Sequence, residues 1–234
     1  MNFLFYDNLI YENDSIVVCV KPPKLKSELD PSGGNDIISA LTEHYRSIGE
    51  KTTIYPVHRL DLGVGGIMVF AKSKSAAAAL CAQIASRTVV KEYLAVVCGK
   101  PEDPSGSYRD LLFRDAKKNK SFVVDRARRG VKEALLDYKV LASEEICEKI
   151  YSLVHVRLHT GRTHQIRVQF SSRKMPLLGD RKYGGEPADE IALWSFRLRF
   201  ADPTNQALLT CTALPEEGPI CAHFDNLREL TANV

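Results

Sequence analysis

Residues 55–72 combine polar side chains, glycines and an apolar run in a pattern that could support chemistry. His58, Arg59 and Asp61 come first, and three glycines separate them from the apolar run 67–71, which predicts a buried strand. Glycine permits backbone angles closed to other residues and lets another chain approach closely, so the loop would hold Asp61 near a rigid core. Two interpretations of Asp61 stay open here: an active-site carboxylate, or a loop residue that caps a turn or pairs with Arg59.

A second segment, residues 158–167, predicts a strand-to-helix turn with basic side chains. Gly161 lets the chain turn, and the free N–H groups of the next helix, with the neighbouring Arg162 and threonine, form a candidate phosphate seat. Arg167 follows among apolar neighbours, where a guanidinium is normally paired with a carboxylate. Asp61 is a reasonable partner and would stay ionised in that pair. The alternative places both arginines on the helix surface.

Four segments of the chain, in order, resemble the motifs of the RluA-type RNA pseudouridine synthases. They are residues 20–23 (Val-Lys-Pro-Pro), 58–61 (His-Arg-Leu-Asp), 91–95 (Lys-Glu-Tyr-Leu-Ala) and 160–167 (Thr-Gly-Arg-Thr-His-Gln-Ile-Arg), the last followed by Pro176, Gly179-Asp180 and Tyr183-Gly184. The chain departs from the family at Val64-Gly65-Gly66, where Thr-Ser-Gly is usual, so two hydroxyls are missing. It departs again at residues 24–26 (Lys-Leu-Lys), where glycine often follows the prolines, and we expect this to alter the fit to RNA rather than the chemistry.

The resemblance implies isomerisation of uridine to pseudouridine within RNA: the base leaves the anomeric carbon, turns, and rejoins through carbon 5. It implies that Asp61 is the catalytic carboxylate, acting on sugar or base. It implies that Tyr93 stacks on the target uracil and assists proton removal from carbon 5, and that Arg167 partners the carboxylate. It also implies that Arg59 fills the gap left by the flipped nucleotide. Flipping costs least in unpaired RNA, so a structured loop is the expected target.

The expected partner is RNA, transfer or ribosomal, and the expected contacts come from Lys21, His58, Arg59, Arg162, Thr163 and His164. No cofactor is expected, because the reaction has no redox or hydrolytic step. No metal is expected either, because the histidines at 155, 159 and 164 lack a fourth ligand and zinc-like spacing. We further expect a monomer. We expect no binding to a membrane, since no apolar run reaches the ~18 residues needed to span one.

Charge is distributed unevenly along the 234 residues, whose net charge is only +3. Residues 109–132 carry nine Lys or Arg against three acids, and residues 157–182 carry seven against one, which leaves −9 for the rest. This asymmetry predicts a basic face for a polyanion, although a single charge run is often only a solvated surface. The six cysteines, none closer than ten residues to another, form neither a zinc nor a redox pattern, and with no secretory signal they favour a reducing cytoplasm.

Regular elements are expected around both segments. Strands are predicted at 16–20, 67–71, 89–97, 150–158, 191–200 and 208–212, with short strands and basic loops over 108–140. Helices are predicted at 37–47 (capped by Asp36), 74–86 (capped by Ser73), 164–172 (capped by Thr163) and 219–230, and a flexible loop at 24–35. Ile37, Leu41, His44, Tyr45 and Ile48 are expected on one face of the first of these helices. On the second, Leu80, Cys81 and Ile84 are expected to face inward.

This pattern predicts an α+β fold: a mixed, mainly antiparallel sheet with helices packed on it, like a pseudouridine synthase catalytic domain. One domain over 1–234 is expected, without a separate N-terminal RNA-binding module, its halves joined near 100–107. Trp194, Phe196 and Phe200 are expected in the core. Two other functions stay open: a metal-independent RNA phosphodiesterase using His58, His159 and His164, and an RNA-binding chaperone without chemistry.

Overall fold

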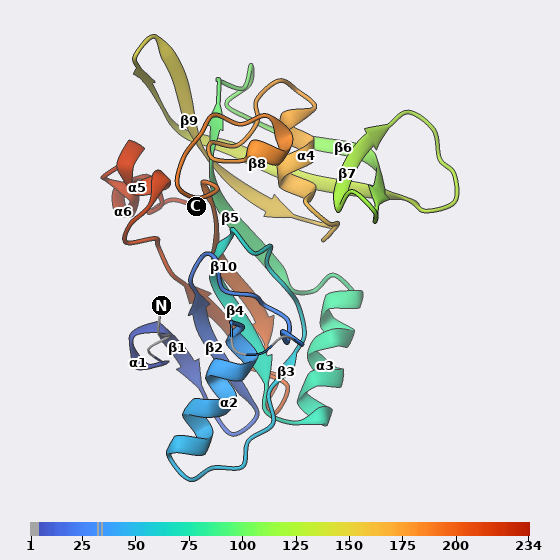
Figure 1. Ribbon diagram of the computed structural model, residues 1–234, viewed down its shortest axis with the longest axis vertical. Helices are drawn as coiled ribbons and strands as arrows, with labels where there is room; N and C mark the ends of the chain where they lie inside the picture. The colour runs from blue at the N-terminus through green and yellow to red at the C-terminus, as the bar shows by residue number, and fades with distance from the viewer. Residues whose placement is uncertain (1–4, 32, 34) are drawn as a thin grey trace. The chain divides into compact units, whose positions relative to one another are not determined.

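The computed structural model describes residues 5–31, 33 and 35–234, and the chain divides into two compact units (Figure 1). Unit 1 comprises the residues up to Val90 together with 195–213, and unit 2 comprises 91–194 together with 214–234. Residues 100–107, where we expected two halves to join, lie inside unit 2. Of the loop expected at 24–35, Ser32 and Gly34 lie outside the described residues.

Unit 1 is a sheet with helices packed on it. Its elements are α1 (Phe5–Asn8), β1 (Leu9–Glu12), β2 (Ile16–Lys21), α2 (Ile37–Ser47), β3 (Tyr55–Pro56), β4 (Gly65–Ala71), α3 (Lys74–Ala85), residues 195–201 of β10 (Leu193–Ala201), and β11 (Leu208–Thr212). The strand order is β1-β2-β4-β10, with β3 paired to β4 and β11 to β10. The pairings β1–β2, β2–β4, β3–β4 and β10–β11 are antiparallel.

The two long helices of unit 1 begin at the predicted capping residues. Asp36 accepts a hydrogen bond from the Ser39 N–H, and Ser73 accepts one from the Ala76 N–H, so each cap satisfies a free donor of the first turn. Of the face predicted for α2, Ile37, Leu41 and Tyr45 are buried, whereas Ile48 lies beyond the end of the helix and is half exposed. Cys81, expected to face inward, is exposed on α3.

The core of unit 1 forms where α3 covers one face of the sheet. Leu80 packs there in a cluster with Ile67 and Val69 of β4 and Phe200 of β10, so Phe200 is a core residue as predicted. Because side chains alternate along a strand, the run 65–71 can be buried at every position only if the other face is covered too.

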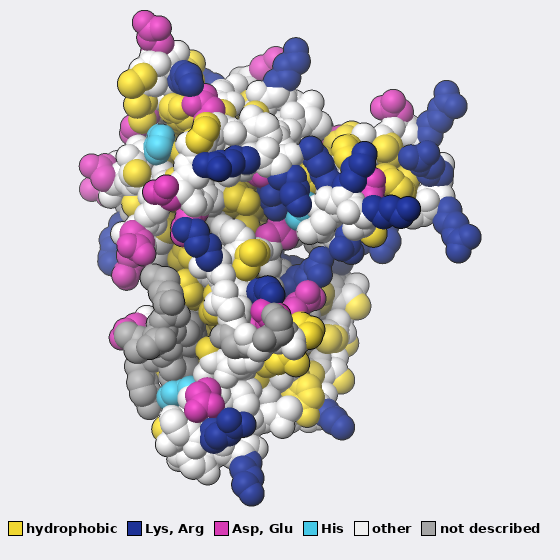
Figure 2. Space-filling view, viewed as in Figure 1, with side chains coloured by type: hydrophobic (Ala, Val, Ile, Leu, Met, Phe, Trp, Pro, Cys, Tyr) yellow, Lys and Arg dark blue, Asp and Glu magenta, His cyan; other side chains and the backbone are white. Residues whose placement is uncertain are grey.

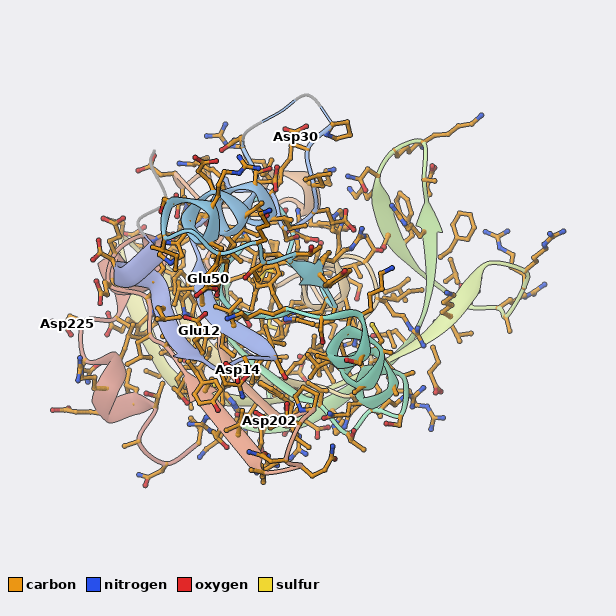
Figure 3. The ribbon with its side chains drawn as sticks, turned by 90° about the horizontal axis from the view of Figure 1, so that it is seen from below. Glu12, Asp14, Asp30, Glu50, Asp202 and Asp225 are labelled. Atoms are coloured by element: carbon orange, nitrogen blue, oxygen red, sulfur yellow. The ribbon has the colours of Figure 1, made fainter. Side chains whose placement is uncertain are left out.

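A polar network connects β1 with α2 and with the residue after β4. Tyr45 Oη donates to Glu12 Oε1 at 2.5 Å, and Lys72 Nζ donates to the same oxygen at 2.7 Å. Burial raises the pKa of Glu12, but these two hydrogen bonds outweigh it and hold the pKa below its usual range. At the neighbouring turns Asn13 Nδ2 donates to Asp202 Oδ2 at 2.7 Å, and Figure 3 labels both Glu12 and Asp202. These bonds tie strands far apart in sequence.

Unit 2 is an antiparallel sheet with short helices. Its elements are β5 (Val90–Cys98), β6 (Ser105–Asp115), β7 (Lys120–Val124), β8 (Val131–Ile146), β9 (Lys149–Leu158), α4 (Gln165–Ser171), the 3₁₀ turn η1 (Arg181–Tyr183), α5 (Pro219–His223) and α6 (Leu227–Leu230). The order β5-β9-β8-β6-β7 is antiparallel at every step. The α+β class with a mainly antiparallel sheet is therefore confirmed, but β6 and β8 are longer than the short strands expected over 108–140.

Two helix predictions in unit 2 are wrong in detail. Thr163 does not cap α4, because the residue before the helix is His164 in a left-handed conformation (φ 54°) with no side-chain cap. The helix expected at 219–230 is broken into α5 and α6, because Phe224 adopts an extended conformation (φ −138°) and is almost fully buried.

Candidate functional site

The loop that carries Asp61 is held in place by backbone carbonyls on both sides of it. The Lys24 N–H donates to the Leu62 carbonyl at 2.8 Å, and Ser27 Oγ donates to the Leu60 carbonyl at 2.7 Å. Both donors come from the segment after β2, so the first and second motif segments are bound together. Leu60 is buried, whereas Asp61 is half-buried and Leu62 is 51% exposed. The loop therefore presents a carboxylate on a fixed backbone beside solvent.

His58 and Arg59 make different contacts beside this loop. The Val69 N–H donates to His58 Nε2 at 3.1 Å, so this hydrogen bond ties the start of the loop to β4. Arg59 pairs with Glu28 (3.3 Å), and not with Asp61 as the alternative interpretation had it. Both side chains of that pair are exposed, and exposed pairs contribute little, so Arg59 can leave Glu28 at small cost.

Lys21 does not fit the expectation that it contacts RNA. Its side chain is fully buried, and its ammonium donates to the Pro22 carbonyl (2.9 Å) and the Leu25 carbonyl (2.8 Å). A cation bonded in this way fixes the turn that follows β2 rather than meeting a ligand in solvent. Lys21 therefore supports the segment from which Lys24 and Ser27 hold the loop of Asp61.

Gly66 is the position in this loop that only glycine can occupy. Its φ is +116°, a conformation that side chains rarely adopt, and a Cβ atom there would overlap the backbone of Ser195. In the antiparallel pairing of β2 with β4, Gly66 lies opposite Lys21. The first residues of β4 therefore approach β10 closely, and this close approach sets where the loop leaves the sheet.

We expect Gly66→Ala to lower the free energy of unfolding of unit 1 by about 3 kcal/mol or more, because backbone strain adds to a clash that only a backbone shift relieves. Gly49→Ala is the matched control: φ there is +83°, but nothing lies within 4 Å of the added methyl. It should cost about 1 kcal/mol, the strain alone. Urea unfolding measures both variants, and equal losses would show that the approach to Ser195 is not tight.

Tyr93 lies on β5, the first strand in the unit 2 order β5-β9-β8-β6-β7. It is paired with Val156 of β9, and only 7% of it is exposed. The sequence placed it on a strand, and the structure agrees.

Arg167 is held by a carboxylate that the sequence analysis did not assign. Its Nε donates to Asp180 Oδ2 at 2.6 Å and its Nη2 donates to Asp180 Oδ1 at 2.8 Å, a bidentate pair. Arg167 is 5% exposed and Asp180 is fully buried. The Tyr183 ring centre lies 5.2 Å from the guanidinium carbon. Arg167 is thus buried in α4, and not on the helix surface.

The Tyr183 hydroxyl connects α4 with β7. It accepts a hydrogen bond from the Ser121 N–H at 2.8 Å and lies 3.0 Å from His164 Nδ1. His164 is 9% exposed, so the expectation that it contacts RNA is corrected: its side chain holds Tyr183. The signal for this network was present in the sequence, because Asp180 and Tyr183 belong to the fourth resembling segment.

Groups of the protein itself engage part of the turn before α4. The Arg162 N–H donates to Gln165 Oε1 at 3.0 Å, and Arg162 Nε donates to the Glu133 carbonyl at 2.8 Å. Ser121 Oγ donates to the Thr163 carbonyl at 2.6 Å. The phosphate-binding site expected at the free N–H groups of this turn is therefore partly occupied by groups of the protein itself. The Arg162 side chain is still half-exposed.

The predicted site residues fall in both units. Asp61, Arg59, His58 and Lys21 lie in unit 1, and unit 2 contains Tyr93, Arg162, Thr163, His164 and Arg167. The expected pairing of Asp61 with Arg167 spans the two units and stays a prediction. Phe196 is buried as predicted, whereas Trp194 is half-buried.

The described residues contain neither a metal-binding cluster nor a membrane-spanning helix. Within 5–31, 33 and 35–234, no group of three or more His, Cys, Asp or Glu side chains is arranged to hold a metal ion. In the same part of the chain, no helix has the length and apolar character needed to cross a membrane.

Comparisons with known proteins give one consistent answer. Residues 15–172 match the family model described as RNA pseudouridylate synthase. An "Uncharacterized RNA pseudouridine synthase" of Aquifex aeolicus (strain VF5) is 39% identical over 183 residues, 76% of this chain and 56% of that protein. A "Ribosomal large subunit pseudouridine synthase D" of Vibrio parahaemolyticus (serotype O3:K6, strain RIMD 2210633) is 35% identical over 90% of this chain and 68% of that protein. The chain thus spans between half and about two thirds of the length of these relatives.

A solved structure shares the fold. Human RNA Pseudouridylate Synthase Domain Containing 1 superposes with a TM-score of 0.74 over 96% of this chain and 86% of that chain. The two sequences are 23% identical, so this similarity speaks for the fold alone.

Proposed function

This chain belongs to the RNA pseudouridylate synthase family, of RluA type, and we propose that it isomerises uridine to pseudouridine in RNA. The observation that carries the proposal is the family match over residues 15–172, which contains all four motif segments in order. In that isomerisation the bond from uracil N1 to C1′ breaks, a bond from C5 to C1′ forms, and the C5 proton moves to the base nitrogen or solvent. Uridine and pseudouridine are isomers, so the net reaction needs no oxidant and adds no water.

We assign the chemical roles to residues of both units. Asp61 is the carboxylate that acts on sugar or base, supported by its place on a fixed, solvent-facing loop. Tyr93 stacks on the uracil and assists removal of the C5 proton. Arg167 partners the carboxylate, and its bidentate bond to Asp180 pre-orients it for that task. Arg59 fills the space of the flipped nucleotide. Its ion pair with Glu28 is exposed and weak, so the side chain can leave Glu28 to do this.

RNA is bound mainly by a basic arm, which we define as residues 105–132: β6, β7 and the loop before β8. Lys and Arg side chains gather over this part of unit 2 in Figure 2. The exposed cations of the arm are Arg109, Arg114, Lys117, Lys118, Arg126, Arg128, Arg129 and Lys132. Phe122 is exposed beside them, and aromatic rings with cations bind bases and phosphates together. The second basic stretch, 157–182, contributes less, because Arg167 and Arg173 are paired with carboxylates.

We expect RNA binding to weaken as salt rises, because each phosphate contact releases a counterion. Changing Arg126, Arg128 and Arg129 together to Gln should lower the steepness of log affinity against log salt by about 2 to 3, since three contacts at roughly 0.7 to 0.9 each are removed. Filter binding or fluorescence anisotropy at several salt concentrations measures the steepness.

A second triple variant controls for net charge alone. Arg46, Lys51 and Lys74 of unit 1 are exposed, and changing them to Gln removes the same charge outside the arm. This variant should leave the salt dependence within error of wild type. If both triple variants reduce it equally, the arm has no special part in binding.

The RNA class that we propose is ribosomal RNA, supported by the name of the Vibrio relative. The experiment is to incubate the protein with ribosomal and transfer RNA lacking modifications, and then to map pseudouridine at single-nucleotide resolution. Pseudouridine in ribosomal RNA alone supports the full proposal, and a site in transfer RNA corrects the substrate.

The same experiment tests the two other functions, the phosphodiesterase and the chaperone. Shortened RNA would indicate a phosphodiesterase, although His58 Nε2 already accepts a backbone hydrogen bond and His159 Nε2 lies 2.6 Å from Asp137 Oδ2. RNA that is bound but unchanged in every preparation would indicate a chaperone. Either result would overturn the proposed isomerisation.

A further inference from the structure

The Lys91 side chain is a partly buried cation without a counter-charge in its unit. Within the described part of unit 2, no hydrogen bond or ion pair reaches its ammonium group. Burial lowers the pKa of this ammonium below its usual value, and no carboxylate nearby raises it again. Burying part of an ammonium group without a partner costs free energy of folding, so this charge does not stabilise the folded unit.

The adjacent acid, Glu92, does not neutralise Lys91. Neighbouring side chains on a strand point to opposite faces, so Glu92 lies on the other face of β5. There its Oε2 lies 3.5 Å from Nε2 of His155, a residue of β9. The carboxylate closest in sequence is therefore engaged on the opposite side of the sheet.

The face that Lys91 shares is the one with Tyr93. The two residues are separated by one position on β5, so their Cα atoms are about 6.6 Å apart along the strand. The Lys91 Nζ lies 3.5 Å from the place where a Cβ of Gly161 would be, and Gly161 is exposed. The ammonium thus lies beside the exposed turn before α4, on the tyrosine's side of the sheet.

We propose that Lys91 binds a phosphate of the substrate RNA, next to the uridine whose base stacks on Tyr93. An ammonium is a compact point charge with three donors, which suits a phosphate oxygen reached from solvent. Within unit 2 the free protein gives this cation no partner, because its counter-charge arrives with the RNA. Gly161 leaves room for the approach, since any side chain there would lie against the ammonium. The inference rests on the proposed function and names a specificity contact of the same site.

The test compares Lys91→Met, which keeps the length and removes the charge, with Lys91→Arg, which keeps the charge. The RNA is a fragment that the wild-type protein converts. We expect Lys91→Met to raise the Kd about tenfold and to lower the salt dependence of log affinity by about 0.7 to 0.9, the share of one phosphate contact. Lys91→Arg should retain the wild-type salt dependence.

Neutral phosphates then identify the contact directly. The phosphates on either side of the target uridine are replaced one at a time by methylphosphonate. We expect one of these fragments to bind wild type about tenfold more weakly and to bind Lys91→Met no more weakly than the unmodified fragment does. Equal losses for both proteins at each position would overturn the proposal. A lower kcat for Lys91→Met with an unchanged salt dependence would also overturn it, and would point to the uracil oxygens instead.

Lys139→Met is the matched control, because Lys139 is an exposed lysine on β8 of the same unit and outside the basic arm. It should leave affinity and salt dependence unchanged. Failure of the inference and failure of the function give different results. A wild-type protein that converts no uridine in any RNA defeats the function, whereas an active wild type with an equally tight-binding Lys91→Met defeats only the inference.

Discussion

Asp61→Asn should abolish the formation of pseudouridine while leaving RNA bound. The amide has nearly the shape of the carboxylate but cannot act as nucleophile or base, and losses on the order of 10⁴-fold or more follow when such a group is removed. The loop should keep its conformation, because the carbonyls of Leu60 and Leu62, which the substitution leaves in place, accept hydrogen bonds that fix it. Single-turnover conversion of the mapped RNA measures the rate, and anisotropy measures binding.

Glu28→Gln is the control for this variant. It removes another carboxylate of unit 1, the one paired with Arg59, and both side chains of that pair are exposed. Conversion should change little, since an exposed pair contributes at most about 1 kcal/mol. If Asp61→Asn retained a tenth or more of the wild-type rate, Asp61 would not be the reacting carboxylate, and another acid of the chain would have to be.

The sequence predicted those parts of the fold that depend on neighbouring residues. Asp36 and Ser73 cap their helices as expected, because a capping side chain acts on an N–H only three residues away. The strand at 208–212 has the predicted bounds, and the strand at 150–158 begins one residue earlier. Alternation and turn residues are sufficient for such elements.

The errors arise where a distant contact overrides the local pattern. The closing helix breaks because Phe224 is buried, and nothing in the periodicity of residues 219–230 shows that. Thr163 looks like a cap, but its carbonyl is fixed by Ser121 of β7 and the next residue is left-handed. Lys21 looks like an RNA contact because it is basic, and only the structure shows that its ammonium is turned onto backbone carbonyls.

The candidate site shows the same division between local and distant information. Residue types and spacing singled out the segments 58–61 and 158–167 as candidates, and the family resemblance added Tyr93. The acid that holds Arg167 was named with the fourth segment but not paired, because a pair 13 residues apart depends on how α4 and η1 pack. The expectation that a buried arginine is paired with a carboxylate was correct, and the carboxylate that the structure shows is Asp180.

Asp180→Asn should destabilise unit 2 by about 3 to 5 kcal/mol, the usual loss when one partner of a buried ion pair is removed. Arg167 and Asp180 are 5% and 0% exposed, so water cannot replace the missing charge. Urea unfolding followed by fluorescence measures the loss, because Trp194 is the single tryptophan of the chain and belongs to unit 2. An unchanged urea midpoint would show that the pair is not needed to balance the buried guanidinium.

Glu133→Gln is the matched control, since Glu133 pairs with Arg109 in the same unit at 2.7 Å but the two side chains are 44% and 75% exposed. It should cost less than about 1 kcal/mol.

A double variant separates stability from catalysis. Arg167→Met with Asp180→Leu replaces the buried pair by apolar side chains, which often restores stability. We expect this variant to unfold at a higher urea concentration than Asp180→Asn, yet to form no pseudouridine, because it lacks the guanidinium that we propose as the partner of the Asp61 carboxylate. If it formed pseudouridine at the wild-type rate, Arg167 would serve the fold alone, and the cation beside Asp61 would have to come from elsewhere in the chain.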